Sequence, residues 1–443
     1  MHPKTMGSLL VTLVIAMPLT MRADRDDRRH DDRDCRESEH HEHNVNTPVQ
    51  LLGVIAVPGN PIMSTDIGWV DPGTERFYLA DRSNFGVDII EAEDNFYAGR
   101  VAGMAGPKPS GGGTSTTNGP GPNGVLVTPN RRLWAGDGNS TVQVADVDPD
   151  SPTYLMILKS VNTANATCDT NTPPGNPASI TGHWCGRADE LGYDPKDHLI
   201  LVANNAPLSP AKICPTPTNP AAHCAVAPYA TLIDARTYGV LGQITFTGAG
   251  GLEQPLWDAA LRRFWITVPG PAGGSPMIAR IDPTKLPLTV DKSIVLDCKA
   301  LTGTASASIT GIALGPFQHL LVSACGFPIV LSALTGHIFN VITEVGGGDE
   351  VWHNPGDNRF YVTAADTTTL VQSLGVIDAE TSTWLRNVQD VRGRNAAAFA
   401  ENNHVFNAVT TPAPPTVEDP RSPCVQFGLV GRGCIAVFGH SDE

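Results

Sequence analysis

Seven oxygen-bearing side chains occupy the same position in seven short repeated segments. Each residue stands five positions before the first turn of its segment. They are Asp66, Asn123, Asp189, Glu253, Thr310, Asp349 and Asn395. Four are carboxylates, and none is a histidine. Because the position is equivalent in every segment, we expect the side chains to converge on the centre of a repeat-built fold.

A converging set of oxygen atoms is the donor chemistry that a hard cation prefers. Ca²⁺ takes roughly six to eight oxygen ligands, and without a cation several neighbouring carboxylates repel one another. The sequence therefore predicts a divalent metal, Ca²⁺ in the first instance. The predicted ligands are Asp66, Asn123, Asp189, Glu253, Asp349 and Asn395. The alternative is a polar central channel filled with water.

The segments have the pattern of a β-propeller. Each has a polar residue, a short apolar strand, a turn and a strand rich in aromatic and branched residues, as in "DIGWVDPGTERFYLAD". A third strand ending like "VID" and a fourth strand follow in most copies. This predicts an all-β fold, a seven-bladed β-propeller of four-stranded blades. The last copy lacks a fourth strand, so we expect the N-terminal strand at 49–57 to close the last blade.

The long connections all belong to one face of the predicted propeller. They are 105–122, 161–188 and 298–309 between blades, and 204–227 and 411–431 within blades. The eight cysteines beyond Cys35 lie in or beside them, and we expect sequential pairing, although many pairings are possible. The expected pairs are Cys168–Cys185, Cys214–Cys224, Cys298–Cys325 and Cys424–Cys434. Stapled loops on one rim are typical of a binding or catalytic mouth; the alternative is that insertions accumulate where they are tolerated.

Several basic residues lie close in sequence to the predicted ring positions. His183 and Arg187 lie in "GHWCGRADE", just before Asp189, so a general base or an anion clamp is expected there. The catalytic candidates are accordingly His183, Arg187, Asp189 and Glu253. Arg392 and Arg394 precede Asn395 and are candidates for holding a substrate carboxylate.

Other histidines have structural explanations. His198, His319 and His404 recur at one turn on the opposite face, which marks a repeated structural position. His353 lies in a first strand and is expected to be packed or hydrogen-bonded rather than catalytic.

The repeats resemble the YVTN-type and related seven-bladed propellers, which include extracytoplasmic binding proteins and a streptogramin lyase. Three copies also resemble the gluconolactonase, senescence-marker-protein and paraoxonase group, in "EQPLWD" at Glu253, "NGVLVTP" at Asn123 and "DELGYDP" at Asp189. In that group, matching residues hold a catalytic divalent metal. That group is six-bladed and its ring order differs, so one ion would not reach all seven positions here.

The ends and the composition define three regions. Residues 1–23 resemble a signal peptide, 24–46 form a charged tail expected to be disordered, and 47–443 hold the propeller. The formal net charge is -15, with no basic stripe, which argues against a nucleic-acid partner. No later segment is long enough to span a membrane, so we expect a secreted or periplasmic monomer. Asn139 and Asn165 are in glycosylation sequons.

Three functions fit this sequence. The first is an exported metal-dependent hydrolase of lactonase or esterase type, acting at the channel mouth on a small-molecule or polymer-derived substrate. The second is a non-enzymatic propeller that binds a ligand or protein on the same face. The third is a metal-dependent lyase.

Overall fold

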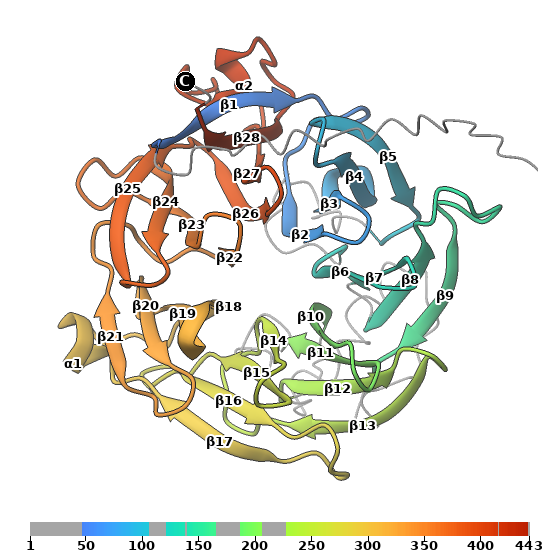
Figure 1. The fold of residues 1–443 in the computed structure, drawn as a ribbon, viewed down its shortest axis with the longest axis vertical. Coiled ribbons are helices and arrows are strands. Elements are labelled where there is room, and N and C mark those ends of the chain that lie inside the picture. The colour runs from blue at the N-terminus through green and yellow to red at the C-terminus, as the bar shows by residue number, and fades with distance from the viewer. Residues whose placement is uncertain are drawn as a thin grey trace, which may run out of the picture. The chain divides into compact units, whose positions relative to one another are not determined.

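The computed structural model describes residues 47–105, 121–137, 140–164, 187–205, 227–414 and 416–441. Seven four-stranded antiparallel sheets are arranged as blades around a central axis (Figure 1). The innermost strands contact one another in order, and that of the last blade contacts that of the first, so the ring is closed. The predicted seven-bladed β-propeller is confirmed.

The strands of each blade are given from the innermost outward. Blade 1 has β2 (Thr65–Asp71), β3 (Arg76–Asp81), β4 (Gly86–Glu91) and β5 (Phe96–Ala102). Blade 2 has β6 (Val125–Thr128), β7 (Arg132–Asp137), β8 (Thr141–Asp146) and β9 (Ile157–Asn162). Blade 3 has β10 (Arg187–Asp194), β11 (Leu199–Asn205), β12 (Tyr229–Asp234) and β13 (Gly239–Thr245). Blade 4 has β14 (Pro255–Asp258), β15 (Arg263–Val268), β16 (Met277–Ile281) and β17 (Val290–Val295).

The remaining blades follow the same order. Blade 5 has β18 (Ile309–Leu314), β19 (His319–Ala324), β20 (Phe327–Ser332) and β21 (Ile338–Val341). Blade 6 has β22 (Val351–Asn354), β23 (Arg359–Ala365), β24 (Gln372–Asp378) and β25 (Thr383–Gln389). Blade 7 has β26 (Gly393–Phe399), β27 (His404–Val409), β28 (Cys434–His440) and, from the N-terminal side, β1 (Val49–Ile55).

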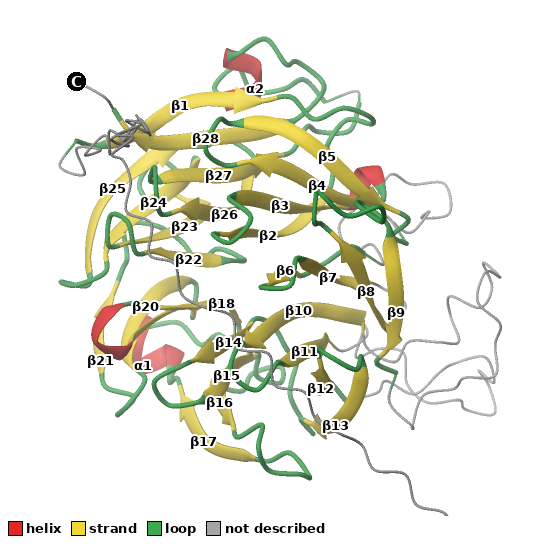
Figure 2. Cartoon of the chain, turned by 45° about the vertical axis from the view of Figure 1, so that its right-hand side comes forward, coloured by secondary structure: helices red, strands yellow, loops and turns green. Residues whose placement is uncertain are grey.

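The ring is closed by a strand from the other end of the chain. β1 pairs antiparallel with β28, from Val49 opposite His440 to Ile55 opposite Ile435 (Figure 2). This pairing covers the strand edge that the last repeat leaves open. The predicted N-terminal closure is therefore confirmed.

Apolar packing between blades holds the ring together. Each of seven buried apolar clusters lies between two neighbouring blades. One of them lies between blade 7 and blade 1, where the ring closes. Second strands supply much of this core, because their aromatic residues pack against the preceding blade; Phe77, Phe264 and Phe360 are fully buried. Gly315 of blade 5 makes room for Phe360 of blade 6, since a Cβ there would meet the ring at 2.4 Å, and Gly68 makes room for Phe77 within blade 1, where the distance would be 2.6 Å.

The first turn of each blade is tight and occupies the face opposite the long connections. A non-glycine residue with positive φ ends it in every blade: Glu75, Arg131, His198, Arg262, Gln318, Asn358 and Asn403. His198 lies in this turn, and His319 and His404 begin the strands that follow it. The three histidines thus lie at the same turn, as expected, but His198 ends the turn whereas His319 and His404 follow it.

Two of the four expected disulfides fall within the described residues, and both are present. Cys298 pairs with Cys325, and Cys424 pairs with Cys434. The other four cysteines of the expected pairs, the expected signal peptide and tail, His183, Asn139 and Asn165 lie outside the described ranges. In the part of the chain that the structure describes, no helix is long and apolar enough to cross a membrane.

Candidate functional site

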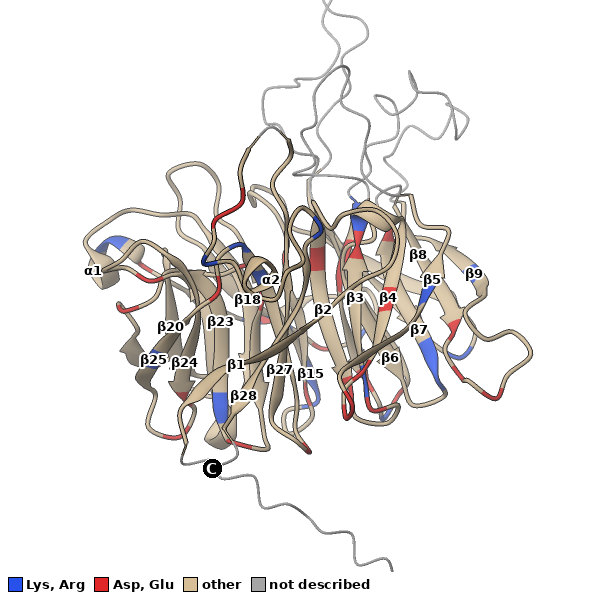
Figure 3. Ribbon diagram, turned by 90° about the horizontal axis from the view of Figure 1, so that it is seen from above, with Lys and Arg blue, Asp and Glu red and all other residues tan. Residues whose placement is uncertain are grey.

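The inner ends of the blades bring the ring carboxylates into electrostatic range of one another. Burial raises the pKa of Glu253 well above its usual value, and the negative charges of Asp189, Asp349 and Asp66 add to this shift. Burial likewise raises the pKa of Asp349, with Asp66 and Asp189 contributing. Residues from four blades thus share one site. Figure 3 shows the propeller from the side, with acidic and basic positions marked on the ribbon.

Two arginines, Arg82 and the half-buried Arg187, neutralise one side of the ring. Arg82 is 3% exposed; its Nη2 donates to an Asp66 carboxylate oxygen and, at 2.6 Å, to Asn123 Oδ1. The Arg187 Nε and Nη2 atoms lie 2.8 and 2.6 Å from Asp189 Oδ2. We call Asp66, Arg82, Asn123, Arg187 and Asp189 the paired side.

The local chain geometry places Arg82 at the inner ring. Arg82 begins a 3₁₀ turn, η1 (Arg82–Asn84), directly after β3. Asp81 caps this turn, because its Oδ1 accepts from the backbone N–H groups of Ser83 and Asn84 at 2.8 and 3.1 Å. Asn123 is oriented in turn by its Nδ2, which donates to the Ala188 carbonyl at 2.8 Å.

Glu253 lies at the edge of the paired side. Asn205, at the end of β11, donates through Nδ2 to Glu253 Oε1 at 3.1 Å and to Asp189 Oδ2 at 3.2 Å. One amide therefore links the two carboxylates. This contact explains the carboxylate at the head of β14, which is held without a cationic partner in direct contact among the described residues.

Two further glutamates lie directly beneath the ring. Glu190 and Glu350 are 3% and 0% exposed, and burial raises the pKa of each well above its usual value. The Gly68 N–H donates to Glu350 Oε2 at 3.1 Å. Glu190 Oε2 and Glu350 Oε1 are buried without a hydrogen-bond partner among the described residues. Both follow an aspartate of the ring, so the repeated Asp-Glu pair was the sequence signal for them.

The opposite side of the ring borders a cavity of about 280 Å³ at the loop-rich face. Its lining includes Ser308, Thr310, Ser323, Gly348, Asp349 and Arg394. The Thr310 Oγ1 and Ser323 Oγ each donate to the Gly348 carbonyl at 2.6 Å. We call Thr310, Asp349, Arg394 and Asn395 the open side.

The charged groups of the open side are not paired in direct contact. The Asp349 carboxylate and the Arg394 guanidinium make no hydrogen bond and no ion pair with any residue that the structure describes. The positive charge of Arg394 nevertheless opposes the upward shift of the Asp349 pKa, so the two groups are near each other. Asn395 is fully buried, and neither its Oδ1 nor its Nδ2 has a partner within the described ranges.

The backbone that carries Arg394 is fixed by a buried chain of hydrogen bonds. The Arg394 N–H donates to Asn407 Oδ1 at 3.0 Å, and Asn407 Nδ2 donates to Asp390 Oδ2 at 2.5 Å. Burial raises the pKa of Asp390 to about 8. Arg392, the other basic candidate, instead donates through Nε to the Thr410 carbonyl at 2.7 Å, within its own blade.

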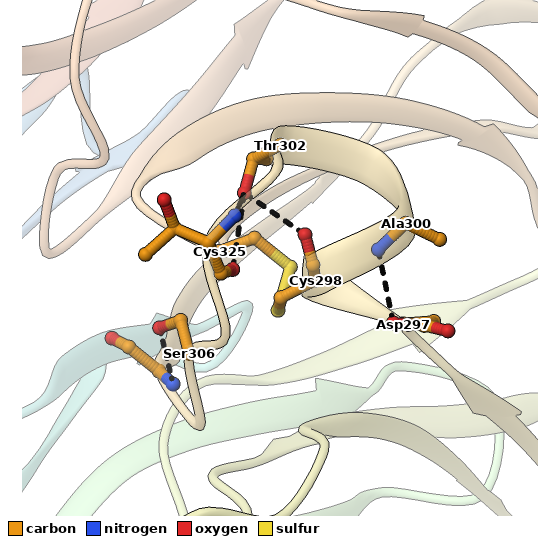
Figure 4. The surroundings of a disulfide bond; sticks show 8 residues. Asp297, Cys298, Ala300, Thr302, Ser306 and Cys325 are labelled. Carbon is orange, nitrogen blue, oxygen red and sulfur yellow. Dashed lines mark hydrogen bonds between the residues drawn. A yellow bond between two sulfur atoms is a disulfide. The ribbon is translucent and has the colours of Figure 1, made fainter.

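A disulfide braces the wall of the cavity (Figure 4). Cys298 begins the short helix α1 (Cys298–Thr302) in the connection from blade 4 to blade 5, and Cys325 begins the β19–β20 turn. The Cys325 N–H donates to the carbonyl of the lining residue Ser308 at 3.0 Å. The bridge therefore ties the connection to the blade next to the cavity.

The predicted metal ligands do not form a ready metal site. No three Asp, Glu, His or Cys side chains within the described ranges are placed to hold a metal ion. Asp66, Asn123 and Asp189 already accept hydrogen bonds from arginines, which a cation would have to displace. The residues as they are arranged do not fit a cation held by the whole ring.

Comparisons with known proteins support the fold only. No protein-family model matches the chain, and a search of curated proteins finds no match. A chain of the "Crystal Structure of Mitotic Checkpoint Complex" is similar over 98% of this chain and 100% of that one, with 12% identity and a TM-score of 0.52. "Kuenenia stuttgartiensis Hydrazine Synthase" is similar over 79% and 93%, with 9% identity and a TM-score of 0.54. The Myceliophteria thermophila Cps50 (Swd1) β-propeller domain covers 80% and 95%, with 9% identity and a TM-score of 0.50.

Proposed function

We propose that the chain is an exported, non-enzymatic propeller that binds a small polar ligand at the open side. The observation that carries this proposal is the presence of two unpaired charges of opposite sign, Asp349 and Arg394, beside a cavity of about 280 Å³. Small-ligand pockets have volumes of roughly 300–1,000 Å³ and a few convergent polar groups. The two disulfides agree with export, because such bonds persist in oxidising compartments.

The lining defines the chemistry of the ligand. The Arg394 guanidinium offers donors to a carboxylate, which it can bind with two parallel hydrogen bonds. The Asp349 carboxylate accepts from O–H or N–H groups. Thr310 and Ser323 donate their hydroxyl protons to the Gly348 carbonyl, so their oxygens remain available to accept hydrogen bonds from a ligand. The ligand therefore carries a carboxylate at one end and hydroxyl or ammonium groups at the other.

Calorimetric titration of the full chain tests this function. The probes are D-gluconate and L-serine, each with a counterpart that lacks the carboxylate, D-glucitol and L-serinamide. We expect saturable binding of at least one acid, and at least tenfold weaker binding by its counterpart. Arg394→Met should abolish the difference, and the matched control Arg421→Met should retain it, because Arg421 pairs with Asp419 on the surface. Equal binding of acids and counterparts would contradict the proposal.

The metal-dependent hydrolase or lyase is the second candidate. It is favoured by four ring carboxylates and by the unpaired Asn395, and it is disfavoured by the two arginines that hold the paired side. Ca²⁺ would act there by polarising a carbonyl or activating water. Titration with Ca²⁺ distinguishes the candidates: we expect no saturable binding at millimolar Ca²⁺, whereas tight binding lost in Glu253→Gln would favour the hydrolase.

A further inference from the structure

A second site lies on the outer rim, where the ring is closed between blades 6 and 7. A cavity of about 550 Å³ occurs there. Its lining includes Pro48, Arg359, Asp366, Val376, Trp384 and Arg386. The one carboxylate among them, Asp366, accepts from Asn387 Nδ2 at 2.7 Å and makes no ion pair with Arg386. Thr47 also lines the cavity. Thr47 and Pro48 precede the closing strand β1, and Trp384 and Arg386 belong to β25.

Arg386 occupies a position that is equivalent in several blades. The outermost strand of each blade has a β-bulge, and Lys292, Asn340 and Arg386 each follow this bulge directly in blades 4, 5 and 6. Lys292 Nζ donates to the Leu334 carbonyl of blade 5 at 2.6 Å. Asn340 Nδ2 donates to the Ser382 carbonyl of blade 6 at 2.8 Å. Both carbonyls belong to the turn between the third and fourth strands of the next blade.

Blade 7 has no such turn. Its third strand, β28, ends at His440, and its fourth strand, β1, begins at Val49, so the connection is replaced by two separate chain segments. Lys292 and Asn340 donate to carbonyls of this turn in the next blade. Arg386 has no turn carbonyl of this kind in blade 7. Its Nε is buried without a partner, and its guanidinium makes no hydrogen bond or ion pair to any described residue.

The surroundings of Arg386 make an unpaired cation costly. Arg386 lies opposite Val376 and two residues before Val388, and both valines pack in the apolar cluster between blades 6 and 7. A cation against an apolar face is stabilised by an anion with geometry that suits a guanidinium. Trp384, which is 37% exposed, adds an aromatic surface beside it.

We propose that this ring-closure cavity binds a small organic anion. A sulfate, phosphate or carboxylate group receives the hydrogen bonds of Arg386 and so replaces the missing turn carbonyls. A ring or apolar body attached to it lies against Trp384 and Pro48. The site is distinct from the open side and does not depend on the proposed function.

Titration of the full chain with phenyl sulfate tests this site, with benzyl alcohol as the uncharged comparison and calorimetry or ligand-observed NMR as the readout. We expect saturable binding of one phenyl sulfate, at least tenfold weaker in Arg386→Gln and retained within a few fold in Arg386→Lys. Trp384→Ala should weaken phenyl sulfate more than inorganic sulfate. The matched control Lys292→Gln should bind as the wild type does, because its ammonium has carbonyl partners.

The outcomes separate the proposal from its competitors. Absence of saturable binding, or binding unchanged in Arg386→Gln, would overturn it. Equal binding of benzyl alcohol would show an apolar patch without an anion site and would also overturn it. Circular dichroism of each variant confirms folding. Trp384→Ala keeps the test decisive if Arg386→Gln does not fold, because equal weakening of phenyl sulfate and inorganic sulfate would contradict the proposed arrangement.

Discussion

The two sides of the central ring use the same kinds of side chain in opposite ways. On the paired side, Arg82 and Arg187 are in direct contact with Asp66 and Asp189. On the open side, Asp349 and Arg394 are near each other without contact and border a cavity. A carboxylate at a repeated position is thus not evidence of a site by itself. A carboxylate that is paired with a neighbouring arginine stabilises the fold, whereas a carboxylate without such a partner remains available to a ligand.

The comparison predicts that the paired side carries stability. Arg82→Met leaves the Asp66 carboxylate buried and uncompensated, which should lower the free energy of unfolding by ~3–5 kcal/mol. Arg394→Met on the open side removes a cation without a contact partner and should change it by less than ~0.5 kcal/mol. Urea unfolding followed by fluorescence measures both. Similar losses in the two variants would remove the distinction between the sides.

The Cys298–Cys325 disulfide should stabilise both the fold and the cavity. It closes a loop with a sequence separation of 27 residues, and its loss as Cys298→Ser with Cys325→Ser should cost ~3 kcal/mol. Binding at the open side should weaken as well, because Ser308 is tied to the Cys325 backbone. The corresponding double serine variant at Cys424 and Cys434 is the control, since it should reduce stability without changing ligand affinity.

Stability should also depend on pH through Asp390, which supports the backbone of Arg394 on the open side. The Asp390 carboxyl is fully buried with a pKa of about 8, above its ordinary value of 3.8, so the folded chain binds a proton that the unfolded chain releases. Its contribution is complete below about pH 4 and falls as pH rises towards 8, by at most ~1.4 kcal/mol per pH unit. Unfolding at pH 6 and pH 8 should show this loss. Asp390→Asn, which keeps an acceptor for Asn407, should reduce the difference between the two pH values.

The smallest effect is expected at Glu253. Its pKa is raised by burial and by neighbouring carboxylates, so the neutral form is favoured in the folded chain. Glu253→Gln retains an acceptor for Asn205 and should change the free energy of unfolding by less than ~1 kcal/mol. A loss of several kcal/mol would mean that the ionised carboxylate is needed, as a metal site would require.

The sequence predicts the architecture well because the repeat is local. Each blade carries its own strands and turns, so equivalent positions such as Asp66 and Asp349 are visible without any structure. The disulfides Cys298–Cys325 and Cys424–Cys434 match the sequential pairing that was expected among many possible pairings. The closing strand β1 is predicted from the missing fourth strand of the last repeat.

The pairing within the ring was not predictable in the same way. Arg82 and Asn205 come from the ends of second strands, and their partners lie in other segments or blades. The contacts of Arg82 with Asp66 and Asn123 join residues 16 and 41 positions apart, and no local pattern contains them. Arg187 and Asp189 are only two residues apart. Arg187 was expected to act on a substrate, but its contact with Asp189 was not anticipated.

Chemical modification of arginine tests the difference between the two sides most directly. The native chain is treated with phenylglyoxal, and modified residues are identified by peptide mass spectrometry, with the exposed Arg421 as the reference. We predict that Arg394 reacts at a rate comparable to Arg421 and that D-gluconate protects Arg394 alone. Arg82 and Arg187 should react only when the chain unfolds. Reaction of Arg82 at the rate of Arg394 in the native chain would contradict the account.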